Sequence, residues 1–329
     1  MRVLVTGGTG ILGTQVIPTL YNKGYEVLAT RRPSSDTRFL GPLADHIQWA
    51  EADLLDLPVL MKLLEGVEAV VHCAALVSFR KRDTDLMLHT NEEGTANLVN
   101  ACLEHRVSKF IHVSSVAALG KSKNQTIIDE SAKWQESSLN SAYAESKYRA
   151  EIQVWRGEEE GLNVSVINPS VILGPGKWEA SSMQLFKYVR DEGLFYPSGD
   201  VNYVDARDVA RSIALLLESN HSGERFILNA GKVSYQRMFG LIAKQMNCHP
   251  PQITASKGMV QVAYALDHIK SMLLRKEPLI TRDAIRLSRM DLLYSNEKIK
   301  NTLGFEFTNL EETIRWTCTE LMNDFVKAK

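Results

Sequence analysis

The sequence predicts an α/β protein in which a doubly wound parallel sheet carries a smaller, mainly helical C-terminal lobe. Three observations lead to this prediction. Short apolar, β-branched runs alternate with longer stretches of helical spacing through the first half of the chain. A glycine-rich turn follows the first run, and beyond Pro169 the pattern becomes mostly helical. The alternation favours repeated βαβ units, and the later change favours an appended lobe.

Six strands and four helices are predicted in the first half of the chain. The strands are rich in Val, Ile and Ala and cover residues 3–5, 26–30, 47–50, 69–73, 110–113 and 164–167. The helices carry apolar residues three and four positions apart and cover residues 11–22, 57–65, 85–105 and 141–160. Three of these helices end near Gly24, Gly66 and Gly161, because glycine readily takes the left-handed conformation that closes a helix.

The rest of the chain is predicted to be mostly helical, with one further strand. Loops are marked by Gly174-Pro175-Gly176 and by residues 197–200. Helices are predicted over residues 183–190, 205–218, 237–247, 259–274 and 310–325, and a strand over 225–229. We expect residues 1–170, together with 203–230, to form the sheet domain. Residues 171–202 and 231–329 would form a lobe over the carboxyl ends of the strands, where open parallel sheets bind ligands.

Composition and charge exclude several classes of protein. The 329 residues include 38 basic and 39 acidic side chains, so no charge excess could neutralise a nucleic-acid backbone, and we expect no nucleic-acid partner. No stretch reaches the roughly 20 apolar residues of a membrane-spanning helix, and no signal peptide is apparent. The cysteines Cys73, Cys102, Cys248 and Cys318 show no metal-ligand spacing. We therefore expect a cytoplasmic protein with reduced thiols, no metal and no membrane contact.

The glycine-rich turn from Thr6 to Gly13 predicts a phosphate-binding loop. It reads Thr-Gly-Gly-Thr-Gly-Ile-Leu-Gly and lies between the first predicted strand and the first predicted helix. There, glycines allow a tight turn and a close approach to a pyrophosphate, and the helix N-terminus supplies free N–H groups. A turn without a ligand is the alternative. We expect a dinucleotide to be held by Gly7, Thr9, Gly10, Ile11, Leu12 and Gly13.

The end of the second predicted strand indicates which dinucleotide is bound. Proteins that bind NAD place an Asp or Glu here, which accepts hydrogen bonds from the ribose. This chain has Thr30-Arg31-Arg32-Pro33, and two guanidinium groups without a carboxylate suit a 2′-phosphate. We therefore predict that Arg31 and Arg32 select NADP(H) over NAD(H). Two ordinary surface arginines are the alternative interpretation.

Residues after the third and fourth predicted strands are further candidates for cofactor contacts. Asp53 could accept from the adenine amino group while Leu54 covers the ring, although either Asp53 or Asp56 could be a helix N-cap. The small residues Ala74-Ala75 would let the cofactor pass close to the backbone. We expect His72, just before them, to be packed in the core, because no second metal ligand accompanies it.

Tyr143 and Lys147 are the candidate catalytic pair. They are four residues apart and therefore lie on one face of the helix predicted over 141–160. A free phenol is too weak an acid at neutral pH, and a neighbouring cation would lower its pKa. Tyr143 follows a strand that ends in Ser114-Ser115. The same spacing recurs at Tyr294 and Lys298, far from any glycine loop or strand-end hydroxyl, so we expect Tyr294 to be structural.

These motifs resemble those of extended short-chain dehydrogenases/reductases, also grouped as the NAD-dependent epimerase/dehydratase family. The resemblance covers nearly the whole chain and rests on the glycine turn, Asp53-Leu54, His72 to Ala75, Asn91 to Asn97, Val113 to Gly120, Tyr143 with Lys147, and Asn168 to Pro175. It implies a Rossmann sheet that binds a nicotinamide cofactor. The implied catalytic residues are Ser115, Tyr143 and Lys147, of which the last two also touch the cofactor. The implied nicotinamide contacts are Pro169, Ser170 and Val171.

Departures from the family pattern narrow the implied reaction. Family dehydratases carry an Asp-Glu pair directly after the active-site hydroxyl, where this chain has Val116-Ala117. Sugar-nucleotide epimerases often carry an Arg-Asp-Tyr segment where this chain has residues 200–210. Together with Arg31 and Arg32, these differences resemble the dihydroflavonol-reductase-like subgroup, whose members reduce ketones and aldehydes with NADPH.

The resemblance implies an NADP(H)-dependent oxidoreductase that interconverts a ketone or aldehyde and an alcohol by hydride transfer. Ser115 would bond the carbonyl oxygen, Tyr143 would donate the proton, and Lys147 would lower the pKa of Tyr143 and orient the ribose. We expect Asn91 and Ser114 to be supporting residues. A sugar-nucleotide epimerase with retained NAD(P) and a non-catalytic NADP-sensing protein are the alternatives.

The identity of the small-molecule substrate does not follow from the sequence. Apolar residues in the lobe permit a hydrophobic substrate, although core packing explains them equally well. These residues are Met183, Leu185, Phe186 and Phe195.

A homodimer is one interpretation of the helices predicted over 85–105 and 141–160, because these helices pair subunits in many family members. Tyr148, Ile152 and Trp155 could line such a face. Burial of these side chains against the sheet is the simpler interpretation.

Overall fold

A computed structural model describes residues 1–78, 80–121, 126–137, 140–178, 182–255 and 292–327. Its centre is a sheet of seven strands: β1 (Arg2–Thr6), β2 (Glu26–Arg31), β3 (Gln48–Glu51), β4 (Ala69–His72), β5 (Lys109–Val113), β7 (Val164–Pro169) and β11 (Glu224–Leu228). The six strands predicted for the first half of the chain are confirmed, and the strand predicted over residues 225–229 is the seventh.

The strand order β11-β7-β5-β4-β1-β2-β3 makes the sheet doubly wound, as predicted, and every pairing is parallel. The chain builds one half of the sheet outward from β1 and the other half outward from β4. The winding direction therefore reverses between β1 and β4. Open parallel sheets bind ligands at this point, outside the carboxyl ends of the strands.

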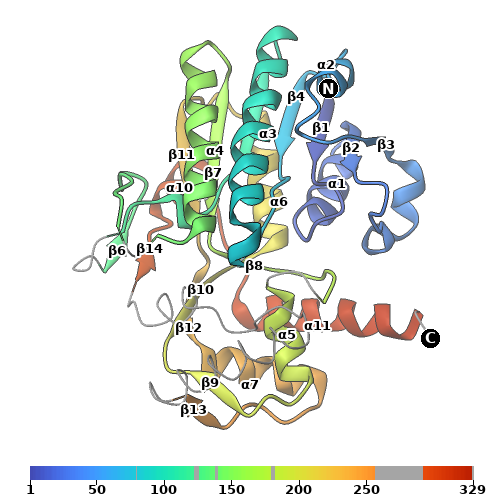
Figure 1. Ribbon diagram of the computed structural model, residues 1–329. Coiled ribbons are helices and arrows are strands. Elements are labelled where there is room, and N and C mark those ends of the chain that lie inside the picture. Colours follow the sequence, from blue (N-terminus) through green and yellow to red (C-terminus); the bar gives the residue numbers. More distant parts are fainter. Residues whose placement is uncertain (79, 122–125, 138–139, 179–181, 256–291, 328–329) are drawn as a thin grey trace.

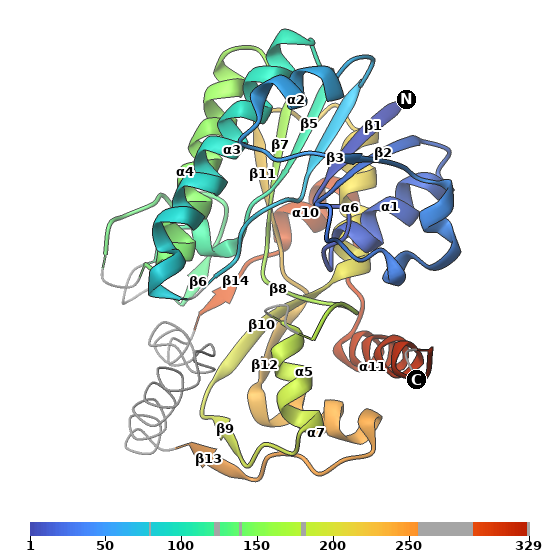
Figure 2. The same cartoon turned by 45° about the vertical axis from the view of Figure 1, so that its right-hand side comes forward.

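Helices cover both faces of the sheet (Figures 1 and 2). One face carries α1 (Gly13–Asn22) and α6 (Ala206–Glu218), and the other carries α2 (Leu57–Leu63), α3 (Thr84–Glu104) and α4 (Ala142–Glu159). Strand side chains alternate between the layers: Val3 and Val5 pack with α1 and α6, whereas Leu4 packs with α2, α3 and α4. Because both faces are covered, the central strands read as continuous apolar runs.

The lobe lies beyond the carboxyl ends of the strands, at the bottom of Figure 2. Its helices α5 (Met183–Arg190), α7 (Tyr235–Met246) and α11 (Leu310–Lys327) match the predicted ranges. Two small sheets that the sequence did not predict accompany them: β8 (Val171–Leu173), β10 (Asp200–Asp205) and β12 (Gly231–Ser234), and β9 (Phe195–Pro197) with β13 (Ile253–Ala255). The helix predicted over residues 259–274 lies outside the described residues.

The apolar residues considered for substrate binding divide between the core and the surface of the lobe. Met183 and Phe186 are fully buried in the lobe core, and Leu185 packs against that core. Phe195, on β9, is 38% exposed. Core packing therefore accounts for Met183 and Phe186.

Part of the C-terminal half returns to the sheet domain. Strand β14 (Leu293–Tyr294) pairs with β6 (Ile127–Ile128), and α10 (Glu297–Leu303) follows β14. Ile299 and Phe305 lie in the core beneath α1 and α6, although we expected this part of the chain in the lobe. Tyr294 is buried in a small cluster with Ile227 of β11, so it is structural, as predicted.

Short 3-10 segments cover residues 38–46, 81–83 and 116–118.

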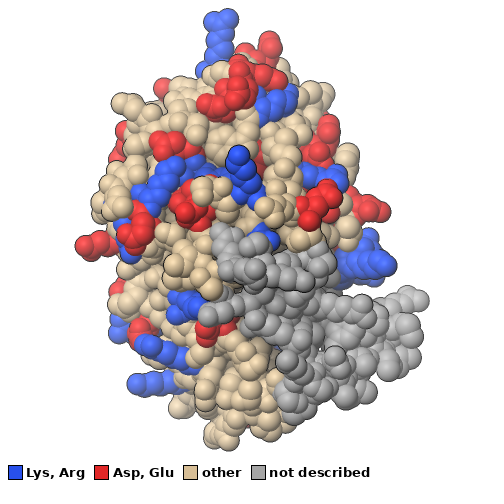
Figure 3. Space-filling view, turned by 90° about the vertical axis from the view of Figure 1, so that its left-hand side faces the viewer, with Lys and Arg blue, Asp and Glu red and all other residues tan. Residues whose placement is uncertain are grey.

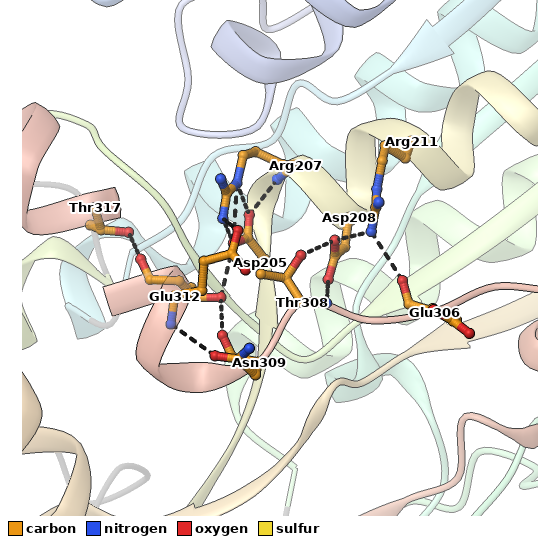
Figure 4. Close-up of polar contacts among 10 residues, drawn as sticks. Asp205, Arg207, Asp208, Arg211, Glu306, Thr308, Asn309, Glu312 and Thr317 are labelled. Carbon is orange, nitrogen blue, oxygen red and sulfur yellow. Dashed lines mark hydrogen bonds and ion pairs between the residues drawn. The ribbon is translucent and has the colours of Figure 1, made fainter. Parts of the chain in front are cut away.

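A cluster of charged residues joins α11 to the start of α6 (Figure 4). The fully buried Asp205 carboxylate accepts from the Arg207 guanidinium at 2.7 Å and from the Thr313 hydroxyl at 2.8 Å. The same guanidinium lies over the Trp316 ring, 4.1 Å from its centroid, and 3.5 Å from the Glu312 carboxylate. Because Thr313, Glu312 and Trp316 belong to α11, this cluster fixes the C-terminal helix to the sheet domain.

Helices α3 and α4 lie side by side on one outer face. Our expectation that Tyr148, Ile152 and Trp155 are buried against the sheet is wrong for Ile152, which is 43% exposed. Tyr148 stacks on Trp134 of the preceding loop, with ring centroids 4.4 Å apart. Trp155 packs against the core. A homodimer through these helices stays a prediction.

Basic and acidic side chains are intermixed on the face shown in Figure 3, as the balanced composition predicts. None of the helices in the described part of the chain is long and apolar enough to cross a membrane. All four cysteines are free thiols.

Candidate active site

The glycine turn lies at the switch point, between the carboxyl ends of β1 and β4. Gly7 has a φ of 71°, and a Cβ there would lie 2.9 Å from the backbone of Ala74. A Cβ on Gly13 would lie 2.3 Å from the Gly7 carbonyl oxygen. Both positions therefore require glycine. Helix α1 starts without a side-chain cap. The N–H groups of Thr14 and Gln15 donate to the carbonyls of Gly10 and Leu12, so an anion would meet the N–H groups of the turn before them.

Two arginines end β2. The Arg31 guanidinium lies over the Trp49 ring, 5.6 Å from its centroid, and its buried Nε has no hydrogen-bond partner among the described residues. The Arg32 side chain is exposed, and its backbone N–H donates to Ser35 Oγ at 3.0 Å. The only carboxylate between residues 30 and 40, Asp36, is paired with Arg38 at 2.5 Å. This end of β2 thus carries net positive charge.

The structure shows which of the two aspartates after β3, Asp53 or Asp56, is the N-cap of a helix. Asp56 is the N-cap of α2, because its carboxylate accepts from the Val59 N–H at 3.1 Å. The Asp53 carboxylate accepts from the Leu55 N–H at 3.0 Å and remains exposed. Asp53 is therefore free of a capping role, and the neighbouring Leu54 is held against Gly94 of α3.

His72, at the end of β4, is a buried core residue, as predicted. Its Nδ1 lies 2.7 Å from Thr6 Oγ1, and its Nε2 lies 3.1 Å from Thr95 Oγ1. Burial lowers the pKa of His72 to about 3, so the ring is neutral. The Thr6 hydroxyl also accepts from the Ala74 N–H at 3.2 Å, which holds the turn after β4 against the glycine turn.

Asn91 supports the same turn from α3. Its side-chain oxygen accepts from the Leu76 N–H at 2.7 Å, and its amide donates to the Leu76 carbonyl at 2.9 Å and to Ser146 Oγ at 3.1 Å. Asn91 is buried, so its supporting role matches the sequence prediction.

Ser115 and Tyr143 meet just beyond the end of β5. Ser115 caps a short helical turn by accepting from the Ala117 N–H at 3.1 Å. Tyr143 lies in the first turn of α4, whose N-cap is Ser141. The Ser115 and Tyr143 side chains share a hydrogen bond. Burial raises the pKa of Tyr143, and the bond to Ser115 opposes this shift, so the phenol keeps its proton at neutral pH.

Lys147 lies one turn further along α4 and is only 3% exposed. Its Nζ donates to the Val113 carbonyl at 2.8 Å. Burial lowers the pKa of Lys147 to about 8, and the Glu151 carboxylate opposes the shift. In the free protein, burial and the bond to Ser115 determine the direction of the shift at Tyr143, and a lowering of the Tyr143 pKa by Lys147 stays a prediction.

Glu151, one further turn along α4, is a functional residue that the sequence did not reveal. This carboxylate is 1% exposed and accepts from Ser114 Oγ at 2.7 Å and from the Asn168 amide at 3.1 Å. It also pairs with Arg225 of β11. A charged residue four positions after Lys147, on the buried face of an amphipathic helix, is the signal that could have revealed it.

The end of β7 carries polar atoms without partners. The Ser170 hydroxyl and the Asn168 side-chain oxygen are buried and have no hydrogen-bond partner among the described residues. Such atoms are costly unless a ligand or water satisfies them. Together with the glycine cradle and the uncapped α1, they fit a dinucleotide whose nicotinamide would lie near β7. The described residues contain no group of three or more side chains that could hold a metal ion.

Comparisons with known proteins agree with this geometry. A sequence model of the NAD dependent epimerase/dehydratase family matches residues 3–231. The "Putative dihydroflavonol 4-reductase" of Synechocystis sp. is 26% identical over 318 residues, which cover 94% of this chain and 91% of that protein. Cinnamoyl-CoA reductase 1 of Petunia hybrida is 26% identical over 335 residues, 97% of this chain and 91% of that protein. The crystal structure of gox2253 superposes with a TM-score of 0.83 at 28% identity and covers 98% of each chain.

Proposed function

This chain belongs to the NAD-dependent epimerase/dehydratase family, and from that premise we propose that it is an NADP(H)-dependent reductase that interconverts a ketone or aldehyde and an alcohol. The observation that carries the proposal is the hydrogen bond between Ser115 and Tyr143, one helical turn from the buried Lys147. Relatives over nearly the full length are named as reductases, which supports a reductase over an epimerase.

The glycine turn and the start of α1 would hold the pyrophosphate of the cofactor, and Ser170 with Asn168 would meet its nicotinamide end. When bound, the nicotinamide supplies or accepts a hydride. The chain's own residues manage the accompanying proton. Tyr143 holds a proton at its phenol oxygen at neutral pH and donates it to the oxygen of the carbonyl substrate. Ser115 bonds the same oxygen and thereby stabilises the negative charge that develops there.

Lys147 supplies a positive charge that acts on Tyr143. Because its pKa is about 8, its ammonium group is mostly charged at pH 7. This positive charge lies one helical turn from Tyr143 and would stabilise the negative oxygen that remains after the phenol has given up its proton. The Val113 carbonyl fixes the position of Nζ, so little reorganisation is needed during turnover.

We further propose that the cofactor is NADP(H), a preference that Arg31 and Arg32 would set. Arg31 Nε lacks a hydrogen-bond partner among the described residues, and the Arg32 side chain is exposed, so both could bond a 2′-phosphate. Asp36, the only carboxylate between residues 30 and 40, is paired with Arg38, so its negative charge is already balanced.

The experiment that tests the function is NADPH oxidation by the purified protein across a panel of aldehydes, ketones and sugar nucleotides. A reductase would consume NADPH and form an alcohol from at least one aldehyde or ketone. An epimerase would instead retain tightly bound cofactor and convert a sugar nucleotide without net oxidation. Cofactor binding without turnover of any panel member would favour a non-catalytic NADP-binding protein.

A further inference from the structure

Glu151 joins three elements of the candidate active site. It lies on α4, its Oε2 accepts from Ser114 Oγ at 2.7 Å, and the same oxygen accepts from the Asn168 amide at 3.1 Å. The Asn168 amide in turn donates to the Ser115 carbonyl at 2.9 Å. The carboxylate therefore connects the helix that bears Tyr143 with the strand ends that bear Ser115 and Ser170.

The other oxygen of Glu151 is also engaged. Oε1 accepts from the Trp155 indole N–H at 3.1 Å and pairs with the Arg225 guanidinium. Every contact of this 1% exposed carboxylate is thus directional, and its position is fixed by four side chains.

Glu151 and Lys147 are both buried on α4, four residues apart and therefore on one face of the helix, and Glu151 is the only carboxylate among the charges that shift the pKa of Lys147. The groups whose charges act on Lys147, or on which Lys147 acts, are Glu151, Cys73, His72 and His112. Burial raises the pKa of Cys73 to about 12, and it lowers the pKa of both histidines far below neutrality, so these three groups are uncharged at pH 7.

We propose that Glu151 is a positioning residue, which supplies the counter-charge for Lys147 and ties the Ser114 and Asn168 side chains to α4. This inference rests on the proposed function for its catalytic meaning, because it treats Lys147 and Ser115 as parts of the machinery. The effect of Glu151 on the titration of Lys147 is a property of the free protein, so it can be measured without substrate.

Arg225 provides a matched comparison. Glu151→Gln and Arg225→Gln both break the same ion pair, so a merely structural role predicts the same consequences for both. Only Glu151→Gln removes the negative charge beside Lys147. The two variants should therefore move the titration of Lys147 differently, because an opposite charge favours the protonated form.

The test uses ¹³C NMR of the full chain labelled at lysine Cε, with the Lys147 signal identified by its loss in Lys147→Met. We expect Glu151→Gln to lower the apparent pKa of Lys147 by about one unit or more. Arg225→Gln should leave it unchanged or raise it. Glu160→Gln, which removes an exposed carboxylate at the end of the same helix, should leave both the titration and the activity unchanged.

Glu151→Gln leaves Arg225 without its partner and could fail to fold. The double variant Glu151→Gln/Arg225→Gln removes both charges and should fold, and it should show the same lowered titration of Lys147. Its alkaline limb of kcat/KM for carbonyl reduction should move to lower pH together with the NMR titration.

The titration of Lys147 tests the role of Glu151, and the reduction of carbonyl compounds tests the proposed function, so the two can fail independently. Equal titrations of Lys147 in the wild type and the double variant would overturn the role of Glu151, whatever the activity. Equal shifts in the double variant and in Arg225→Gln would also overturn it. A wild type that reduces no carbonyl compound would contradict the proposed function, and the titration of Lys147 would still decide the role of Glu151.

Discussion

The ammonium group of Lys147 donates a 2.8 Å hydrogen bond to the backbone carbonyl of Val113. This bond anchors α4 to the last residue of β5. Ser115 follows Val113 by two residues, and Tyr143 precedes Lys147 by one helical turn. The anchor therefore brings together two side chains that come from separate elements, and it explains why Ser115 and Tyr143 lie within hydrogen-bonding distance.

Replacing Tyr143 with Phe should abolish most turnover and retain cofactor binding. The variant removes only the hydroxyl that would donate the proton, and a positioned general acid contributes about 10²- to 10⁴-fold in rate. Steady-state reduction and NADPH fluorescence titration would measure the two effects. Tyr294→Phe is the matched control, because Tyr294 has the same spacing to a lysine but lies in a separate buried cluster. Turnover by Tyr143→Phe at the wild-type rate would refute the assignment.

Replacing Arg31 or Arg32 with Ala should weaken NADPH binding and leave NADH binding nearly unchanged. Each charge-assisted hydrogen bond to a 2′-phosphate contributes about 1.5–3 kcal/mol, which corresponds to a rise in the NADPH Kd of roughly 10- to 100-fold. Lys23→Ala, at the far end of α1, removes an exposed cation without this effect. A wild type that binds NADH more tightly than NADPH would contradict the proposal.

The stability of the protein should depend on pH through Lys147. In the folded protein Lys147 loses its proton near pH 8, whereas its ordinary pKa is 10.5. Between these values the unfolded chain binds more protons, so the free energy of unfolding rises with pH in this window. Relative to Lys147→Met, the wild type should gain about 3 kcal/mol from pH 7 to pH 10.5.

Urea unfolding of both proteins across this pH range would measure that difference. The other lysines and tyrosines titrate in both proteins, so the comparison isolates Lys147. Parallel stability curves for the wild type and Lys147→Met would show that the ammonium group is not held in a desolvated site.

Replacing Arg207 with Met should destabilise the protein by about 3 kcal/mol, because it leaves the buried Asp205 carboxylate without its counter-charge. Glu312→Gln removes the exposed carboxylate on the other side of the same guanidinium and should change stability by less than about 1 kcal/mol. Chemical denaturation of both variants would measure the two free energies. Equal losses of unfolding free energy in the two variants would contradict the larger effect that the burial of Asp205 predicts for Arg207→Met.

The sequence predicted the parts of the site that depend on local spacing. The glycine turn, the Tyr143 and Lys147 pair, and the core position of His72 all follow from neighbours within a few residues. The alternation of strands and helices likewise predicted a doubly wound parallel sheet, because parallel strands joined by helices have few possible arrangements.

Features that depend on distant residues could not be predicted. The partners of Glu151 come from α4, β5, β7 and β11, and no periodicity connects Ser114 with Asn168 or Arg225. The strands of the lobe are too short to show alternation, as in β8 and β9. The pKa of Tyr143 is raised by burial. Burial depends on tertiary packing, so the direction of this shift could not be predicted from the neighbouring residues in the sequence.

The central claim is that Tyr143 donates a proton during net reduction of a carbonyl compound. The most direct measurement is the stoichiometry of NADP⁺ and alcohol formed from an accepted aldehyde or ketone, compared between the wild type and Tyr143→Phe. We expect one NADP⁺ for each alcohol in the wild type and almost none of either product in the variant. Product formation without NADP⁺ release, or equal product from both proteins, would contradict it.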